Sequence, residues 1–208
     1  MKMKGKGLLL SILVLLVFSC QEEESTINTN PDTLVVTSSL TSLLKRVVMS
    51  ETSIDNAIDS SNCVEIQLPL TINFPGGPFT LSQASDYTDL GSIPTNFYNG
   101  LQFPITITRP NHTTAIINSQ AELDAETMDC DVFEESINCI NFNYPLEVFE
   151  YDSANQIQDD LVFSSDAEFY NYLTNLRDGF YFTIGFPVSA TFANGETIEI
   201  SSNEQLLE

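Results

Sequence analysis

An internal repeat constrains the fold of this chain more than any other feature of its 208 residues. The stretch "FPITITRPNHTTAIINSQAEL", from Phe103, aligns without a gap on "FPVSATFANGETIEISSNEQL", from Phe186, at an offset of 83. A second pair, "CVEIQLPLTI" from Cys63 and "CINFNYPLEV" from Cys139, matches at an offset of 76. Because a tandem repeat encodes one supersecondary unit used more than once, the chain is predicted to contain two related halves.

Each half contains two similar hairpin modules. Every module opens with an apolar residue and a proline, at 68–69, 103–104, 144–145 and 186–187, before an alternating run. In the last module, Val188, Ala190 and Phe192 alternate with polar residues, and Asn194-Gly195 supplies the turn into a second strand. Each module is therefore predicted to form a hairpin with one buried face and one wet face.

The prolines at these openings lead to an expectation about sheet edges. A proline has no amide proton to donate to a strand ladder, so it is found on edge strands or at bulges. The residues concerned are Pro69, Pro104, Pro145 and Pro187. Any binding face of the protein is expected at the exposed sheet edges.

A serine-led segment follows each hairpin: "SQAS", "SQAE", "SDAE" and "SNEQ", starting at Ser82, Ser119, Ser165 and Ser202. In the last three, Glu122, Glu168 or Gln205 follows the serine three residues on, which is the capping box of a helix start. The predicted fold class is α+β. It consists of two tandem ββαββα repeats with antiparallel sheets, helices packed on one face, and a pseudo-two-fold relation between the repeats.

Two helices have clear apolar stripes. In "SDAEFYNYLTNLRDG" the stripe residues are Phe169, Tyr172, Leu173 and Leu176, with Arg177 in the last turn and Gly179 as the stop. This stripe is typical of core packing and not of a cofactor site. A helix before the repeats carries Leu40, Leu43, Leu44, Val47 and Val48 at helical spacing. It is expected to cover an open sheet face, or else to lie on a membrane, which its acidic surroundings disfavour.

The N-terminus has the features of a lipoprotein signal. "MKMKGK" precedes the apolar run "GLLLSILVLLVF", which is too short to span a bilayer and suits a secretory signal peptide. The run ends in Val17-Phe18-Ser19-Cys20, which resembles a bacterial lipobox. That resemblance implies that Cys20 becomes the first mature residue and carries acyl chains such as palmitate, which anchor the protein to a membrane. An ordinary secreted protein is the alternative.

The residues after Cys20 point to the cell surface. Gln21, Glu22, Glu23 and Glu24 form the stretch "CQEEES" with their neighbours, and it resembles the acidic export signal of lipoproteins of Bacteroidota. This resemblance implies an outer-membrane protein that faces the extracellular side. A solvated acidic spacer is the alternative, because charge runs are often only that.

The segments are assigned in chain order. They are a signal peptide (1–19), an acidic, polar tether (20–37), an amphipathic helical lead-in (38–60), repeat 1 (61–126), an acidic linker (127–138) and repeat 2 (139–208).

The charge of the chain excludes some partners. The formal net charge is −22, and it becomes −25 once Lys2, Lys4 and Lys6 leave with the signal peptide. Nucleic acid and anionic lipid headgroups are therefore poor partners, so membrane contact is expected through the lipid anchor alone.

Few residues suggest catalysis. His112, the single histidine, lies in the expected turn "RPNHTT", where a solvated turn residue is favoured over a general base. No G-x-S-x-G, P-loop or G-x-G-x-x-G motif occurs. A pair of carboxylates, as in glycosidases, remains the open route to an enzyme.

The acidic linker offers weak candidates for a metal site. Asp129, Asp131, Glu134 and Glu135 could supply oxygen ligands to calcium, but the D-x-D-x-D-G pattern of a calcium loop is missing. A solvated linker is favoured, so no cofactor is expected, with calcium as the alternative.

Three cysteines remain once Cys20 is lipidated, enough for one disulfide and one free thiol. Cys63 and Cys139 hold equivalent repeat positions, so we expect Cys63 to pair with Cys130 and Cys139 to stay free. The alternative bridge joins Cys130 to Cys139. The Cys63–Cys130 bridge closes the longer loop and would restrict the unfolded chain more. In the chain-entropy model it would stabilise the fold by about 4 kcal/mol, against roughly 2 to 3 kcal/mol for a Cys130–Cys139 bridge.

The lipobox with its acidic signal, the helix "LLKRVVMSETSIDNAID", the strand openings and the serine-capped helices resemble an uncharacterised family of flavobacterial-type surface lipoproteins of Bacteroidota. The resemblance implies surface display and transfers no catalytic residue, ligand or substrate. The expected function is a non-catalytic display or interaction module for a protein or glycan ligand, although the absence of Trp weakens a glycan. The alternatives are a calcium-stabilised adhesin and a carboxylate-based extracellular hydrolase.

Overall fold

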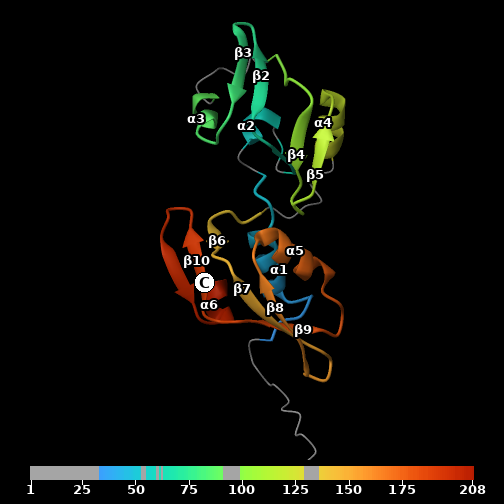
Figure 1. Ribbon diagram of the computed structural model, residues 1–208, viewed down its shortest axis with the longest axis vertical. Coiled ribbons are helices and arrows are strands. Elements are labelled where there is room, and N and C mark those ends of the chain that lie inside the picture. The colour runs from blue at the N-terminus through green and yellow to red at the C-terminus, as the bar shows by residue number, and fades with distance from the viewer. Residues whose placement is uncertain (1–32, 53–54, 60, 62, 91–98, 129–135) are drawn as a thin grey trace, which may run out of the picture.

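The computed structural model describes residues 33–52, 55–59, 61, 63–90, 99–128 and 136–208 (Figure 1). Over these residues the fold is mixed α+β with antiparallel sheets, which confirms the predicted class. The helices are α1 (Ser39–Val47), α2 (Asn56–Asp59), α3 (Asp86–Leu90), α4 (Gln120–Thr127), α5 (Asp166–Asn175) and α6 (Asn203–Leu207).

The strands divide between the two halves of the chain. The first half contains β1 (Glu65–Ile66), β2 (Leu70–Phe74), β3 (Gly77–Leu81), β4 (Ile105–Thr108) and β5 (Thr114–Ile117). The second half contains β6 (Ile140–Phe142), β7 (Leu146–Tyr151), β8 (Ile157–Phe163), β9 (Tyr181–Ile184), β10 (Val188–Phe192) and β11 (Thr197–Ile200). Figure 1 shows the strands of the first half grouped apart from those of the second.

The strand order in the first half recurs in the second. The sheet β1-β4-β5 has the same order as β6-β10-β11, with the middle strand paired antiparallel to both neighbours. In the first half, β2 pairs with β3 on one side and, through a bridge from Ile72, with Leu101 on the other. In the second half, β7 lies in the same way between β8 and β9. Facing residues also correspond at the offsets of 76 and 83. These pairs are Ile105–Ile117 with Val188–Ile200, Ile66–Ile107 with Phe142–Ala190, and Ile72–Leu101 with Val148–Ile184.

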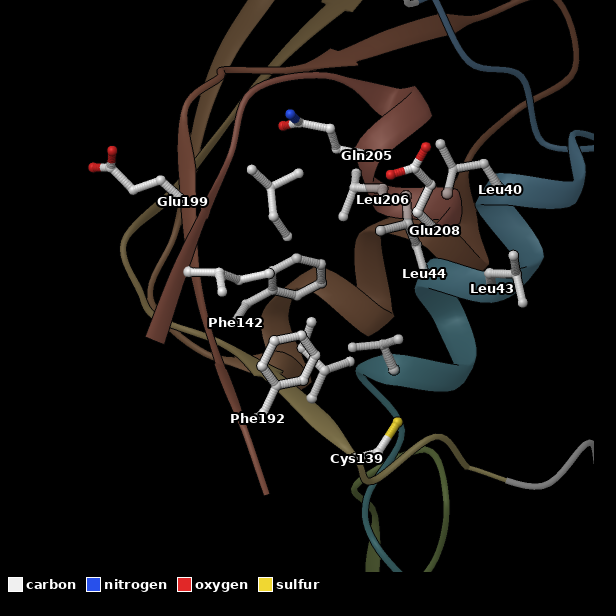
Figure 2. Close-up of a pocket in the computed structure, with 14 residues that line it drawn as sticks. Leu40, Leu43, Leu44, Cys139, Phe142, Phe192, Glu199, Gln205, Leu206 and Glu208 are labelled. Atoms are coloured by element: carbon white, nitrogen blue, oxygen red, sulfur yellow. The ribbon is translucent and has the colours of Figure 1, made fainter. Parts of the chain in front are cut away.

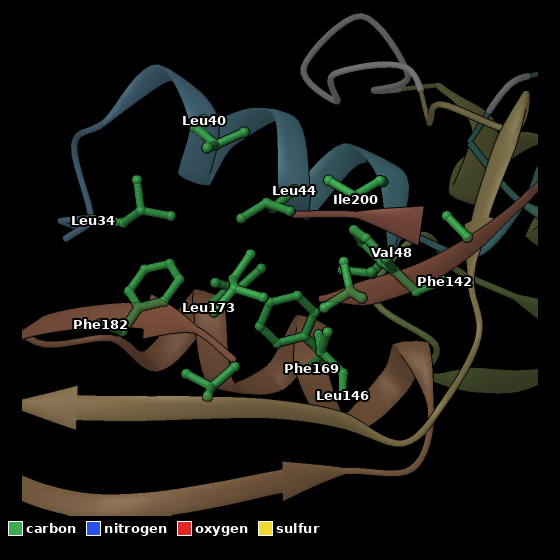
Figure 3. Close-up of a cluster of buried hydrophobic side chains, with 14 of the residues drawn as sticks. Leu34, Leu40, Leu44, Val48, Phe142, Leu146, Phe169, Leu173, Phe182 and Ile200 are labelled. Carbon is green, nitrogen blue, oxygen red and sulfur yellow. The ribbon is translucent and has the colours of Figure 1, made fainter. Parts of the chain in front are cut away.

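The helix α1 belongs to the core of the second half (Figure 3). Its residues Leu40 and Leu44, with Val48 just after the helix, are buried against Phe169 and Leu173 of α5 and the strands of that half. The helix was expected either to cover a sheet face or to lie on a membrane, and the first expectation is therefore correct. A segment from before the first half thus completes the second.

The chain just before α1 is also tied to the second half. Leu34 is buried, and its amide and carbonyl both bond to the backbone of Phe182 in β9, at 2.7 and 3.0 Å. Residue 34 falls in the segment assigned to the tether, so the ordered structure extends into that segment. The first half has a separate apolar core, which includes Ile66, Leu70, Ile72, Leu81, Ile107 and Leu123.

The three predicted capping boxes are confirmed. Ser119, Ser165 and Ser202 each accept a bond from the amide three residues on, at 3.3 Å. The side chains of Glu122, Glu168 and Gln205 return the contact to the amide just before each serine, at 2.8, 2.8 and 2.6 Å. The first module differs, because α3 begins four residues after Ser82 and Asp86 accepts from the amides of Ser82 and Gln83.

The predicted stripe of α5 is confirmed, since Phe169, Leu173 and Leu176 are buried. The helix ends earlier than expected, at Asn175. Arg177 therefore lies beyond the helix, where its guanidinium sits 4.0 Å from the centre of the Phe180 ring.

The expectation that the four prolines mark edge strands or bulges is wrong. Pro104 and Pro187 directly precede β4 and β10, and Pro145 precedes β7, each of which is the middle strand of three. Pro69 likewise directly precedes β2, which pairs with β3. Each proline stands just before its strand, so the amide proton that it lacks is not needed for the hydrogen bonds between strands. A central strand can therefore tolerate a proline at this position. All four peptide bonds before these prolines are cis.

Contacts near the end of α1 join the two halves. The amide of Ser50 donates to the carbonyl of Pro110 at 3.0 Å, and His112 Nε2 lies 2.7 Å from the carbonyl oxygen of Val48. The His112 ring also meets that of Tyr170 edge-on, at 5.8 Å. Among the residues described, no helix is long and apolar enough to cross a membrane.

The position of α1 gives a stability prediction. Leu44→Ala should lower the free energy of unfolding by about 2–5 kcal/mol, because it leaves a cavity between α1 and the second-half core. Urea unfolding of the full chain measures the loss. Leu207→Ala, at a leucine that is 55% exposed, is the matched control and should cost little. An equal loss in both variants would contradict this packing.

Candidate functional site

An apolar pocket of about 530 Å³ lies in the second half (Figure 2). Its walls come from α1, β6, β10, β11 and α6. The apolar lining residues are Leu40, Leu43, Leu44, Val47, Ile140, Phe142, Phe192, Ile198, Ile200 and Leu206. The volume and lining are typical of a site for a small molecule or for an apolar side chain of a partner.

The polar groups of the pocket are few, and the charged ones among them, Glu199 and Glu208, are acidic. Glu199, Gln205 and Glu208 line it together with Cys139, and Figure 2 shows Cys139 at the opposite end from Glu199 and Gln205. No lysine or arginine is among the described residues that line it. Its electrostatics therefore favour a neutral or cationic occupant over an anion.

Local sequence explains why the pocket forms in the second half. The stripe of α1 supplies one wall, and the hairpin β10–β11 supplies another, since Phe192 and Ile198 belong to its two strands. The positions that match Cys139 and Phe142 in the first half are Cys63 and Ile66, which are 3% and 0% exposed.

The cysteines partly follow the prediction. Cys63 is in a disulfide, whereas Cys139 is a free and exposed thiol. The alternative bridge between Cys130 and Cys139 is therefore wrong. Cys130 lies outside the described residues, so its pairing with Cys63 stays a prediction.

His112 is in the expected turn but is not a solvated residue. Its backbone has a φ of 63°, and its half-buried ring packs at the junction of the two halves. Glu51 and Asp166 line a small polar pocket with it, of about 200 Å³. Its contact with the Val48 carbonyl indicates a structural role at this junction.

The remaining predicted site residues lie outside the described part of the chain. They are the lipidation residue Cys20, the export-signal residues Gln21, Glu22, Glu23 and Glu24, and the calcium candidates Asp129, Asp131, Glu134 and Glu135. Within the described ranges, no three His, Cys, Asp or Glu residues form a group that could hold a metal.

An acidic pair in the first half, fully buried Asp55 and half-buried Asp59, was missed by the sequence analysis. Asp55 is 0% exposed and lies at the start of α2, and Asp59 ends the same helix. Asp55 Oδ2 accepts from the amide of Ile66 at 2.6 Å, and Asp59 Oδ1 accepts from the amide of Ser61 at 3.0 Å. The repeat held a signal for this pair, because "DNAIDSSNC" from Asp55 aligns on "DVFEESINC" from Asp131 at the offset of 76.

Burial changes the acidity of this pair. Desolvation, then repulsion from Asp59, raises the pKa of Asp55 to about 7. Desolvation also raises the pKa of Asp59 to about 6. Tyr87 of α3 is affected too, since its own burial and the charges of Asp55, Glu65 and Asp59 raise its pKa to about 12. The electrostatic potential around Asp55 is therefore negative. Among the described residues, the charged groups that act on Asp55 are all acidic, so none of them offsets it.

These shifts give a pH prediction for the metal-free protein. The folded state holds the Asp55 proton more tightly than the unfolded chain does. The stability that this proton contributes is therefore full below about pH 4 and is lost as the pH rises through about 7. Asp55→Asn should therefore become increasingly stabilising, relative to the wild type, from pH 4 to pH 8. Urea unfolding in EDTA measures this. Asp160→Asn, at an exposed position on β8, is the control, and a gain for Asp55→Asn that did not change with pH would contradict the prediction.

No family model, curated protein or solved structure matches this chain.

Proposed function

We propose that this chain is a lipid-anchored surface protein of the outer membrane that acts as a non-catalytic interaction module. The single observation that carries the interaction role is the apolar pocket beside Cys139, because it offers a preformed volume with an acidic rim. The occupant is an apolar group of a partner protein or small molecule that is neutral or positively charged. The net charge of −22 favours the same partners at longer range.

The finer architecture is part of this proposal. The two halves are two tandem ββαββα repeats related by a pseudo-two-fold axis. The support is the common strand order, the residue pairs that correspond at the offsets of 76 and 83, and the shared serine caps. The second repeat differs from the first in its use of α1, and this difference creates the pocket.

The anchor and its direction rest on the sequence. Cys20 follows an apolar signal, and three glutamates stand within the next four residues. A lipidated cysteine before an acidic tether would hold the module at the membrane and let it extend away from the surface. This placement suits a display role, in which the pocket meets a partner outside the cell.

The anchor gives a prediction for cells. Cys20→Ala should release the protein from membranes, because the acyl chains attach to this sulfur. Replacing Glu22, Glu23 and Glu24 by Ala should leave the protein lipidated but shielded from protease added outside intact cells. Fractionation and surface proteolysis measure the two effects. A triple variant that stayed as protease-accessible as the wild type would show that the acidic run is only a spacer.

The pocket gives a prediction in solution. Cys139 is an exposed thiol in its lining, so the rate of its reaction with a small disulfide reagent reports on occupancy. A long-chain alkylamine below its micelle concentration should slow this reaction several-fold. Ile198→Glu should abolish the protection, because it places a charge among the apolar lining residues.

Val162→Glu is the matched control, since Val162 is 63% exposed on the edge strand β8, which contributes no residue to the pocket. This variant should keep the protection. Equal protection in the wild type and in Ile198→Glu would rule out the pocket as the binding site.

A further inference from the structure

The acidic pair of the first half has two oxygen atoms without hydrogen-bond partners among the described residues. Asp55 Oδ1 and Asp59 Oδ2 are both buried, and neither accepts a hydrogen bond from any residue that the structure describes. The other oxygen of each carboxylate is already used by a backbone amide. Buried polar atoms are nearly always satisfied in folded proteins, because an unsatisfied polar atom destabilises the fold and an unsatisfied charged group destabilises it more.

The surroundings of the pair add negative charge. Within the described part of the chain, the charged groups that act on Asp55 are Asp59 and Glu65, and both are acidic. Burial, and then repulsion from Glu51, raises the pKa of Glu65 in β1. No basic side chain among the described residues offsets this charge at Asp55, so the pair favours a positively charged species from solution.

We propose that Asp55 and Asp59 are ligands of a calcium ion that binds in the first half of the chain. One oxygen of each carboxylate, Asp55 Oδ1 and Asp59 Oδ2, is left to face the ion, while the other keeps its backbone amide. Backbone carbonyls and water complete the shell, since calcium accepts six to eight oxygen ligands with flexible geometry. Magnesium suits the pair less well, because it keeps several of its waters and Asp55 is fully buried.

This proposal does not depend on the apolar pocket. The pocket lies in the second half, and none of its lining residues belongs to the acidic pair. With two carboxylates as the only charged ligands, the affinity should be weak, with a dissociation constant of about 0.1–1 mM, the range of calcium sites in extracellular modules. Because protons compete for the same oxygens, binding should weaken as the pH falls from about 8 to about 5.

Thermal unfolding of the full chain tests the site. At pH 8, about 10 mM calcium chloride should raise the unfolding midpoint by roughly 4 °C over EDTA. Asp55→Asn and Asp59→Asn should each lose most of this shift, because they keep the shape of the side chain and remove its charge. Asp160→Asn, on the exposed face of β8, should keep it. Equal magnesium should give a smaller shift in the wild type.

The wild type alone also decides the question. If calcium binds these carboxylates, its effect on the midpoint should shrink at pH 5. An unchanged midpoint at pH 8 would overturn the proposal and indicate a proton shared by Asp55 and Asp59. A shift that survived in both Asn variants would overturn it as well, because the ion would then bind elsewhere on this acidic chain.

Discussion

The packing of α1 against the second half is the contact on which the rest of the structure depends. Leu40 and Leu44 fill the space between α5 and the strands of that half, and Leu34 adds a backbone pair with Phe182. The segment that precedes the first half of the chain thereby closes the core of the second half. The first half is held between two segments that pack together, and the contacts of His112 with Val48 and Tyr170 fix its turn near their junction.

The same helix distinguishes the two halves functionally. The strand pairings of the first half recur in the second, but only the second receives α1. Its leucines form one wall of an apolar pocket whose other walls are β6, the hairpin β10–β11 and α6. The first half has a different unusual feature, the acidic pair of Asp55 and Asp59 beside α2. Sheets with the same strand order thus accompany an apolar pocket in one half and an acidic pair in the other.

Much of the fold could be predicted from local sequence patterns, because turns, helix caps and helix stripes each depend on residues that are close together in the chain. The hairpin at Asn194-Gly195, the serine caps and the α5 stripe are of this kind. The positions of the prolines were misread, because which strand is central depends on long-range pairing. The core position of α1 was foreseen only as one of two options. The pocket could not be foreseen, since it arises where a helix from one end of the chain meets strands from the other. The burial of Asp55 was equally hidden, although its repeat partner at Asp131 was visible in the sequence.

The central claim is that the pocket built by α1 and the second half binds apolar groups, and methyl NMR tests it most directly. The protein would be labelled at Leu and Ile methyls and titrated with a long-chain alkylamine below its micelle concentration. Binding in the pocket should give saturable shifts at Leu43, Ile140, Ile198 and Leu206, which line it, and none at Leu70 or Ile107 in the core of the first half. Shifts that failed to saturate, or that spread equally over both halves, would contradict it.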